Sequence, residues 1–108
     1  MKKVPSKNNA IIRLEKERWI HIVESHNEVA GMMDIILEAV NSPDKIFEGW
    51  DGELLALKMI DKNKGLVVVY RETGANDGFV ITAFLTKRLQ SLEKRRIIWQ
   101  KQRQYKGK

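Results

Sequence analysis

The chain has 108 residues, of which 43% are hydrophobic and none is cysteine, and its formal net charge is +6. This length and hydrophobic content predict one folded domain, while the lack of cysteine excludes a disulfide framework or thiolate metal sites and is typical of the cytoplasm. The apolar runs are far shorter than the roughly 20 residues of a membrane span, and the basic N-terminus leads into Asn8 and Asn9, so we expect neither membrane insertion nor a signal peptide.

Two helices are predicted in the N-terminal half. From residue 10 to residue 26, apolar side chains recur at the spacing of one helix face. A break follows, and the same spacing returns over residues 27–41, with Asn27 as a plausible N-cap. Pro43 should stop this second helix, because the residue before a proline is pushed out of the helical region.

Three strands are predicted next, at Leu54–Ile60, Leu66–Arg71 and Phe79–Leu85, and a short strand at Ile46–Phe47 precedes them. Clusters of Asp, Asn, Lys and Gly separate the three and indicate turns. Turns this short join only antiparallel neighbours, so the strands are expected to form a meander.

Helical spacing returns from Thr86 to about Gln100, and basic residues gather there. Residues 87–108 hold nine Lys/Arg against one Glu, and residues 1–18 hold six against two, whereas residues 19–86 hold five against eleven Asp/Glu. Basic ends on an acidic body favour an anionic partner such as nucleic acid. The alternatives are a solvated helix with a frayed tail, or self-association of the basic ends with the acidic body.

Together these elements predict an α+β fold, with two N-terminal helices packed on an antiparallel β-meander of three to four strands and a basic C-terminal helix. We expect residues 1–9 to be disordered, residues 10–99 to form a single domain, and residues 100–108 to be a basic, flexible tail.

Strand alternation predicts which residues share the face of the sheet that is not covered by the helices. If residues 63–64 form a two-residue turn and residues 74–77 a four-residue loop, then Lys58, Arg71 and Thr82 share this open face. A five-residue second loop would instead move Arg71 off the face of Thr82. Solubilising charges and plain β-propensity would equally explain these residue types. The row predicted to pack on the helices is Phe79, Ile81, Ala83 and Leu85.

The motifs exclude several chemistries. His21 and His26 are five residues apart and there is no cysteine, so no zinc site is expected, and no phosphate-binding glycine loop or nucleophile elbow is present. Metal-free cleavage of RNA needs only a group that takes the 2′-hydroxyl proton, a cation near the phosphate and a proton donor. A histidine with Lys/Arg and Thr is sufficient for this reaction, and no cofactor is required.

The order of motifs along residues 18–99 resembles the barnase–EndoU–colicin–RelE superfamily, and is most similar to its phage-type and small bacterial branches. The resemblance rests on Trp19-Ile20-His21-Ile22 followed by His26-x-Glu28, on Asn41 to Ile46, on Leu66 to Glu72, on Gly78 to Phe84 with its Ile-Thr-Ala, and on the basic stretch that ends in Ile98-Trp99.

The resemblance implies an active site on the open face of the sheet, made by a helix histidine, a basic strand residue and a Ser/Thr on the last strand. Matched by motif, these are His26, Arg71 and Thr82, and the face argument above adds Lys58. Asn27 stands where the family usually has proline, which bears on the placement of His26.

The implied activity is that of a metal-independent, toxin-type endoribonuclease, with an antitoxin or immunity protein as a candidate partner. The residues expected to hold the RNA backbone are Lys87, Arg88, Lys94, Arg95 and Arg96. Two alternatives are a non-catalytic nucleic-acid-binding module and a protein-interaction domain that docks through the segment around Trp99.

Overall fold

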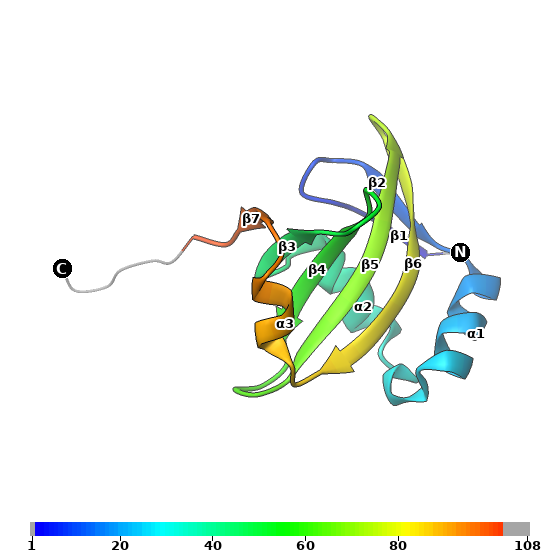
Figure 1. Cartoon of the computed structure of the whole chain (residues 1–108). Helices are drawn as coiled ribbons and strands as arrows, with labels where there is room; N and C mark the ends of the chain where they lie inside the picture. Colours follow the sequence, from blue (N-terminus) through cyan, green and yellow to red (C-terminus); the bar gives the residue numbers. More distant parts are fainter. Residues whose placement is uncertain (1, 103–108) are drawn as a thin grey trace, which may run out of the picture.

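The computed structural model describes residues 2–102 and shows one seven-stranded sheet with helices on both faces (Figure 1). The strands are β1 (Lys2–Pro5), β2 (Ile11–Leu14), β3 (Lys45–Glu48), β4 (Leu54–Met59), β5 (Gly65–Gly74), β6 (Asp77–Thr86) and β7 (Ile97–Gln100). The helices are α1 (Lys16–Ser25), the 3-10 turn η1 (Asn27–Val29), α2 (Met33–Asn41) and α3 (Leu89–Glu93). No helix among these is long and apolar enough to cross a membrane.

The strand order is β1-β2-β6-β5-β4-β3-β7, so the predicted fold of two helices on a three- to four-stranded meander is wrong. The antiparallel β4-β5-β6 meander forms the centre of a larger sheet. The two ends of the described chain supply the outer strands, and β2 pairs with β6 in parallel. Sequence periodicity did not find β2 and β7, because their partners β6 and β3 lie far away in the chain, and it did not find β1, which pairs with the nearby β2.

At the N-terminal end, the structure replaces predicted disorder and predicted helix with strand. Residues 2–5, expected to be disordered, form β1, which pairs with β2. Residues 11–14, expected to be helical, form β2, and the helix begins only at Lys16. Ile11 and Ile12 are β-branched and therefore suit a strand as well as a helix stripe. Their pairing with Asp77 and Gly78 decides between the two.

The second predicted helix, residues 27–41, is shorter than expected. Its first residues form η1, and Gly31, with a φ of 83°, separates this turn from α2. A residue with positive φ cannot continue a right-handed helix, and glycine adopts this φ at little cost. The predicted end of the helix is confirmed, since α2 ends at Asn41, just before the Ser-Pro pair.

The predicted basic C-terminal helix is also mostly wrong. Helix α3 covers only residues 89–93, and residues 97–100 form β7 on the outer edge of β3. The Ile-Ile-Trp sequence of this segment has high β-propensity, and the main chain of β3 offers it hydrogen-bond partners. Of the predicted flexible tail, residues 103–108 lie outside the described residues.

The sheet is apolar on both faces. The larger core cluster lies between the sheet, α1 and α2, and holds Ile36, Val68 and Tyr70, among others. The smaller cluster, which contains Phe47, Leu55, Leu57, Val67 and Leu92, lies on the opposite face under α3. In Figure 1, α2 lies behind the sheet, α3 lies in front of it, and α1 lies beside β6. We call the α3 side, which is covered only in part, the open face.

The β4–β5 connection sets the face of each β4 residue, and it is longer than predicted. Met59 pairs with Gly65, so residues 60–64 form the loop, in which the Asp61 carboxylate accepts hydrogen bonds from the backbone N–H groups of residues 63 and 64. Lys58 therefore pairs with Leu66 and not with Val69. An odd shift in register turns every side chain to the other face, so Leu55 and Leu57 lie on the open face and Lys58 lies on the α2 face.

An irregularity in β6 likewise changes the predicted rows. Tyr70 pairs with Val80 but Val69 pairs with Thr82, so Ile81 is an extra residue, as in a β-bulge. Of the four residues predicted to pack on the helices, Ala83 is buried and Leu85 packs against the larger cluster, whereas Phe79 and Ile81 are only half-buried. Val80 is buried in the larger cluster, which turns its neighbour Phe79 to the open face.

Candidate active site

A shallow basin on the open face brings together polar side chains over an apolar floor. Its cavity has a volume of about 230 Å³, and Leu55 and Phe84 belong to its floor. Helix α3 and its flanking residues provide the other walls, so the basin lies where α3 stops covering the sheet. Its lining residues are Leu55, Phe84, Thr86, Arg88, Ser91, Leu92 and Arg95.

His26 lies beside the basin. It caps the C-terminal end of α1, where its backbone N–H donates to the Ile22 carbonyl (2.7 Å). Its ring centroid is 5.8 Å from that of Phe84, and its Nδ1 is 3.6 Å from a carboxylate oxygen of Glu28. The same carboxylate oxygen accepts a hydrogen bond from the backbone N–H of Leu85 (3.4 Å). Glu28 therefore links His26 to the edge of β6, and a carboxylate facing Nδ1 leaves Nε2 available for proton transfer.

Arg71 lies on the open face at the far end from α3. Its guanidinium donates to the Asp51 carbonyl (2.9 Å) and is 3.9 Å from the Glu53 carboxylate. The pKa of Glu53 is lowered, first by a hydrogen bond from its own backbone N–H, then by the N–H of Asp51 and by the charges of Arg71 and Arg95. These contacts hold the Arg71 side chain against the loop between β3 and β4.

Thr82 lies between His26 and Arg71. On β5, Val67, Val69 and Arg71 pair with Phe84, Thr82 and Phe79 of β6, respectively. Each step is two residues of β5, or about 7 Å. The open face thus carries a row of Phe79, Thr82 and Phe84, with Arg71 opposite one end and His26 beside the other. The strand positions next to His26 and Arg71 are about 13 Å apart, by the rise of four strand residues.

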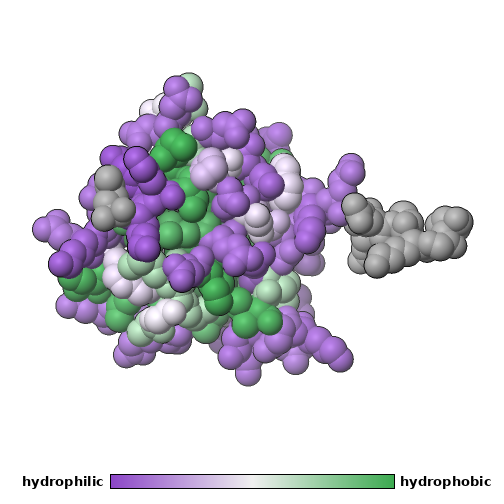
Figure 2. All heavy atoms as spheres, turned by 180° about the vertical axis from the view of Figure 1, so that it is seen from behind, coloured by the Kyte–Doolittle hydropathy of each residue, from purple (hydrophilic) through white to green (hydrophobic). Residues whose placement is uncertain are grey.

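Lys58, the fourth residue predicted for the site, does not join this row. Its Nζ is 3.4 Å from the Glu38 carboxylate of α2 and donates to the Ser42 carbonyl (3.0 Å), on the face opposite Thr82. Figure 2 shows the molecule from behind, the side on which α2 lies, where apolar patches alternate with hydrophilic side chains. The face prediction for Lys58 is therefore wrong, for the register reason given above.

The basic residues of the C-terminal segment divide into two groups. Arg88 and Arg95 line the basin. The Arg95 guanidinium also lies 4.6 Å from the ring centroid of Trp50, whose side chain is 86% exposed. Arg96 is 4.0 Å from the Glu48 carboxylate, and Lys87 and Lys94 are exposed away from the lining of the cavity. Sequence reasoning found the basic segment but not Trp50, which reads as a turn residue.

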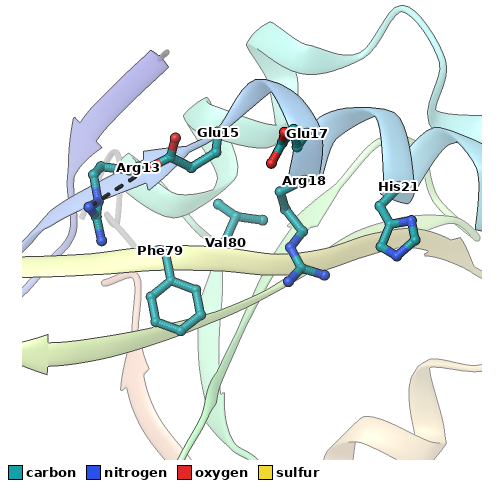
Figure 3. A pocket seen from close by; sticks show the side chains of 7 residues that line it. All are labelled: Arg13, Glu15, Glu17, Arg18, His21, Phe79 and Val80. Carbon is teal, nitrogen blue, oxygen red and sulfur yellow. Dashed lines mark ion pairs between the residues drawn. The ribbon is translucent and has the colours of Figure 1, made fainter.

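A second and larger cavity, of about 540 Å³, lies between α1 and β6 (Figure 3). We call it the α1–β6 cleft. Sequence reasoning missed it, because β2, which supplies one of its walls, was predicted as part of a helix. The cleft is lined by Arg13, Glu15, Glu17, Arg18, His21, Phe79 and Val80.

The open face can perform acid–base chemistry on an anion. The groups on or around it are the imidazole of His26, the hydroxyl of Thr82 and the guanidinium groups of Arg71, Arg88 and Arg95, with Phe84 and Trp50 as aromatic surfaces. Cations beside a bound anion stabilise negative charge as it develops, and aromatic rings next to cations are typical of single-stranded nucleic-acid sites. Among residues 2–102, no group of three or more Asp, Glu or His side chains is arranged to hold a metal ion.

Comparison with known proteins identifies the family. Searches of the curated proteins and of the solved structures found no match. The sequence model of the family described as phage-Barnase-EndoU-ColicinE5/D-RelE like nuclease2 matches residues 2–106, nearly the whole chain. This match confirms the resemblance drawn from the motifs, and the chain belongs to this family of nucleases.

Proposed function

We propose that the protein is a metal-independent endoribonuclease that cuts RNA on the open face, beside the basin. The observation that carries this proposal is the row on β6, in which Thr82 lies between two phenylalanines with Arg71 and His26 at its two ends. A phosphodiester group over Thr82 would have a cation on one side and an imidazole on the other. Membership in a nuclease family supports nuclease activity in general.

In the proposed reaction the RNA supplies its own nucleophile. His26 takes the proton of the 2′-hydroxyl, whose oxygen forms a bond to phosphorus, and the bond from phosphorus to the 5′-oxygen breaks. The 5′-oxygen takes a proton from solvent, which leaves a 2′,3′-cyclic phosphate and a 5′-hydroxyl. Arg71, swung from its contacts at residues 51–53, would neutralise the charge on the phosphorane, and Thr82 would donate a hydrogen bond to it.

The basic side chains around the basin would bind the RNA backbone. Arg88 and Arg95 are the best placed for this, because both line the cavity. A toxin role, a cognate antitoxin or immunity protein, and action in the cytoplasm remain predictions. They rest on the family resemblance and on the cysteine-free sequence.

Incubation of the purified protein with RNA in EDTA tests the proposal. We expect products with 2′,3′-cyclic phosphate ends, and no cleavage of DNA, which lacks the 2′-hydroxyl. Arg71→Ala and His26→Ala should each slow cleavage by about 100-fold. Thr82→Ala should slow it by about tenfold or less, because one neutral hydrogen bond contributes about 0.5–1.5 kcal/mol.

Two results would contradict the proposal: loss of cleavage in EDTA, or full activity of His26→Ala. The second candidate, a non-catalytic nucleic-acid-binding module, is favoured by the Arg95–Trp50 contact, which suits binding without chemistry. It predicts salt-sensitive binding of RNA and DNA alike with no products.

A further inference from the structure

The α1–β6 cleft takes no part in the proposed reaction, although it is larger than the basin on the open face. It exists because β2 pairs with β6 only at residues 77–79, after which the chain turns away into α1. In Figure 3, Arg18 and His21 extend from α1 toward β6, and Phe79 extends from β6 below them. A hollow is left between the helix and the strand.

The cleft is continuous with the row of residues on the open face. Phe79 belongs to both, since it lines the cleft and pairs directly with Arg71. Thr82 is one step of about 7 Å further along the row, and Phe84 is one step beyond Thr82. The two phenylalanines are five residues apart and would lie on opposite faces of a regular strand. The extra residue at Ile81 brings both rings to the same face.

The charges of the cleft differ from those of the basin. Arg13 is held by Asp77 (3.5 Å) and Glu15 (3.9 Å), and its Nε donates to the Gly78 carbonyl (3.3 Å). Arg18, by contrast, has no ion pair within residues 2–102 and is exposed. The imidazole Nδ1 of His21 is 3.8 Å from the Glu24 carboxylate. Arg18 is thus the cation that can accept an anionic ligand without breaking an existing contact.

We propose that the α1–β6 cleft binds one nucleotide of the RNA strand next to the scissile phosphate. The base would stack on Phe79, and Arg18 and His21 would contact the phosphate of that nucleotide. This inference rests on the proposed ribonuclease function, because it places the scissile phosphate over Thr82. The RNA strand would then run along β6, and the bases on either side of the cut would stack on Phe79 and Phe84.

A nucleotide fits the cleft better than a free anion does. The two arginines face two glutamates in the lining, so the cavity carries little net charge and would hold a bare phosphate poorly. An aromatic ring beside an unpaired arginine is instead the arrangement that binds a base and its phosphate together. A volume of about 540 Å³ is also within the range of small-ligand sites.

Binding of uncleavable RNA tests the inference separately from cleavage. The probes are fluorescent 2′-O-methyl dinucleotides and tetranucleotides, which cannot react because their 2′-oxygens are blocked. The tetranucleotide should bind the parent protein more tightly. Arg18→Ala and Phe79→Leu should each weaken its binding by about 5- to 100-fold, the range expected for one base–aromatic stack with its charge.

Lys16→Ala is the matched control, because it removes one positive charge from the exposed surface of α1 outside the lining of the cleft. It should change binding by less than about twofold. Thermal unfolding verifies that each variant is folded.

The outcomes separate the two proposals. Weakened tetranucleotide binding in both cleft variants supports the cleft site, even if the protein cuts no RNA and the ribonuclease function fails. Equal binding by parent, Arg18→Ala and Phe79→Leu overturns the inference. So does an equal loss in Lys16→Ala, which would mean that only the overall charge of α1 matters.

Discussion

Gly78→Ala should destabilise the protein more than any other glycine change in the β5–β6 hairpin. Gly78 lies where β2, β5 and β6 meet, paired with Ile12 on one side and Glu72 on the other. A Cβ at this position would press directly against the backbone carbonyl of Arg71 and would lie 2.6 Å from the Ile12 Cδ1. The Ile12 side chain can turn away, but the carbonyl is main chain inside a sheet and cannot.

The expected loss of stability in Gly78→Ala is therefore at the upper end of the range for overpacked cores, about 3 kcal/mol. For a chain of this size that corresponds to a fall in Tm of roughly 12 °C or more. Because the β5 carbonyl that must move belongs to Arg71, cleavage should fall as well in the variant at temperatures where it remains folded.

Gly74→Ala is the control, in the same hairpin and with the same added methyl group. Nothing lies within 4 Å of a Cβ there, and its φ is not positive. Its stability should stay the same or rise by up to about 1 kcal/mol, because alanine restricts the unfolded chain. Urea denaturation and calorimetry measure both variants. Equal midpoints for Gly78→Ala and Gly74→Ala would refute the packing argument.

Three further predictions concern single side chains. Burial raises the pKa of the Tyr70 hydroxyl, so the contribution of Tyr70 to stability is complete below pH about 10 and is lost at higher pH. Absorbance titration of a Tyr105→Phe variant should show ionisation of Tyr70 only on unfolding. A reversible titration of the folded protein would contradict this. Because the pKa of Glu53 is lowered, its carboxylate stabilises the fold at pH values above the ordinary pKa range of glutamate, and this stabilisation is lost as the pH falls through the lowered pKa. The parent should therefore be more stable than Glu53→Gln at neutral pH and should lose this advantage in acid. Lys58→Met should change RNA cleavage by less than about twofold, because Lys58 contacts α2 on the other face; a tenfold loss would return this lysine to the active site.

Local signals predicted the centre of the sheet well. Strands β4, β5 and β6 lie within a few residues of their expected positions, because alternation and turn residues are properties of neighbouring positions in the chain. Strands β2 and β7 were missed for the opposite reason, and β1, which pairs with the nearby β2, was missed with them. Residues 11–13 pair with residues 77–79, and residues 45–47 pair with residues 97–100, so the information that decides their structure is distant in sequence.

The candidate site was predictable only as far as the register between neighbouring strands could be inferred from the sequence. The pairing of Val69 with Thr82 is as expected, and Arg71 lies two residues further on the same face. Lys58 was misplaced because the turn before β5 is five residues long and not two. The bulge at Ile81, which puts both phenylalanines on the open face, has no residue signature of its own. The α1–β6 cleft follows from β2, so it could not be foreseen once that strand was taken for helix.

The parts that complete the basin come late in the chain. Arg88 and Arg95 line it, and Leu92 covers the smaller core cluster, yet the strands beneath them are finished by residue 86. A chain cut after residue 86 would keep the strands β4, β5 and β6 but would lack both of these cations. For the proposed ribonuclease, loss of the C-terminal segment would thus remove two of the groups that hold RNA and leave the central strands and His26, Arg71 and Thr82 in the chain.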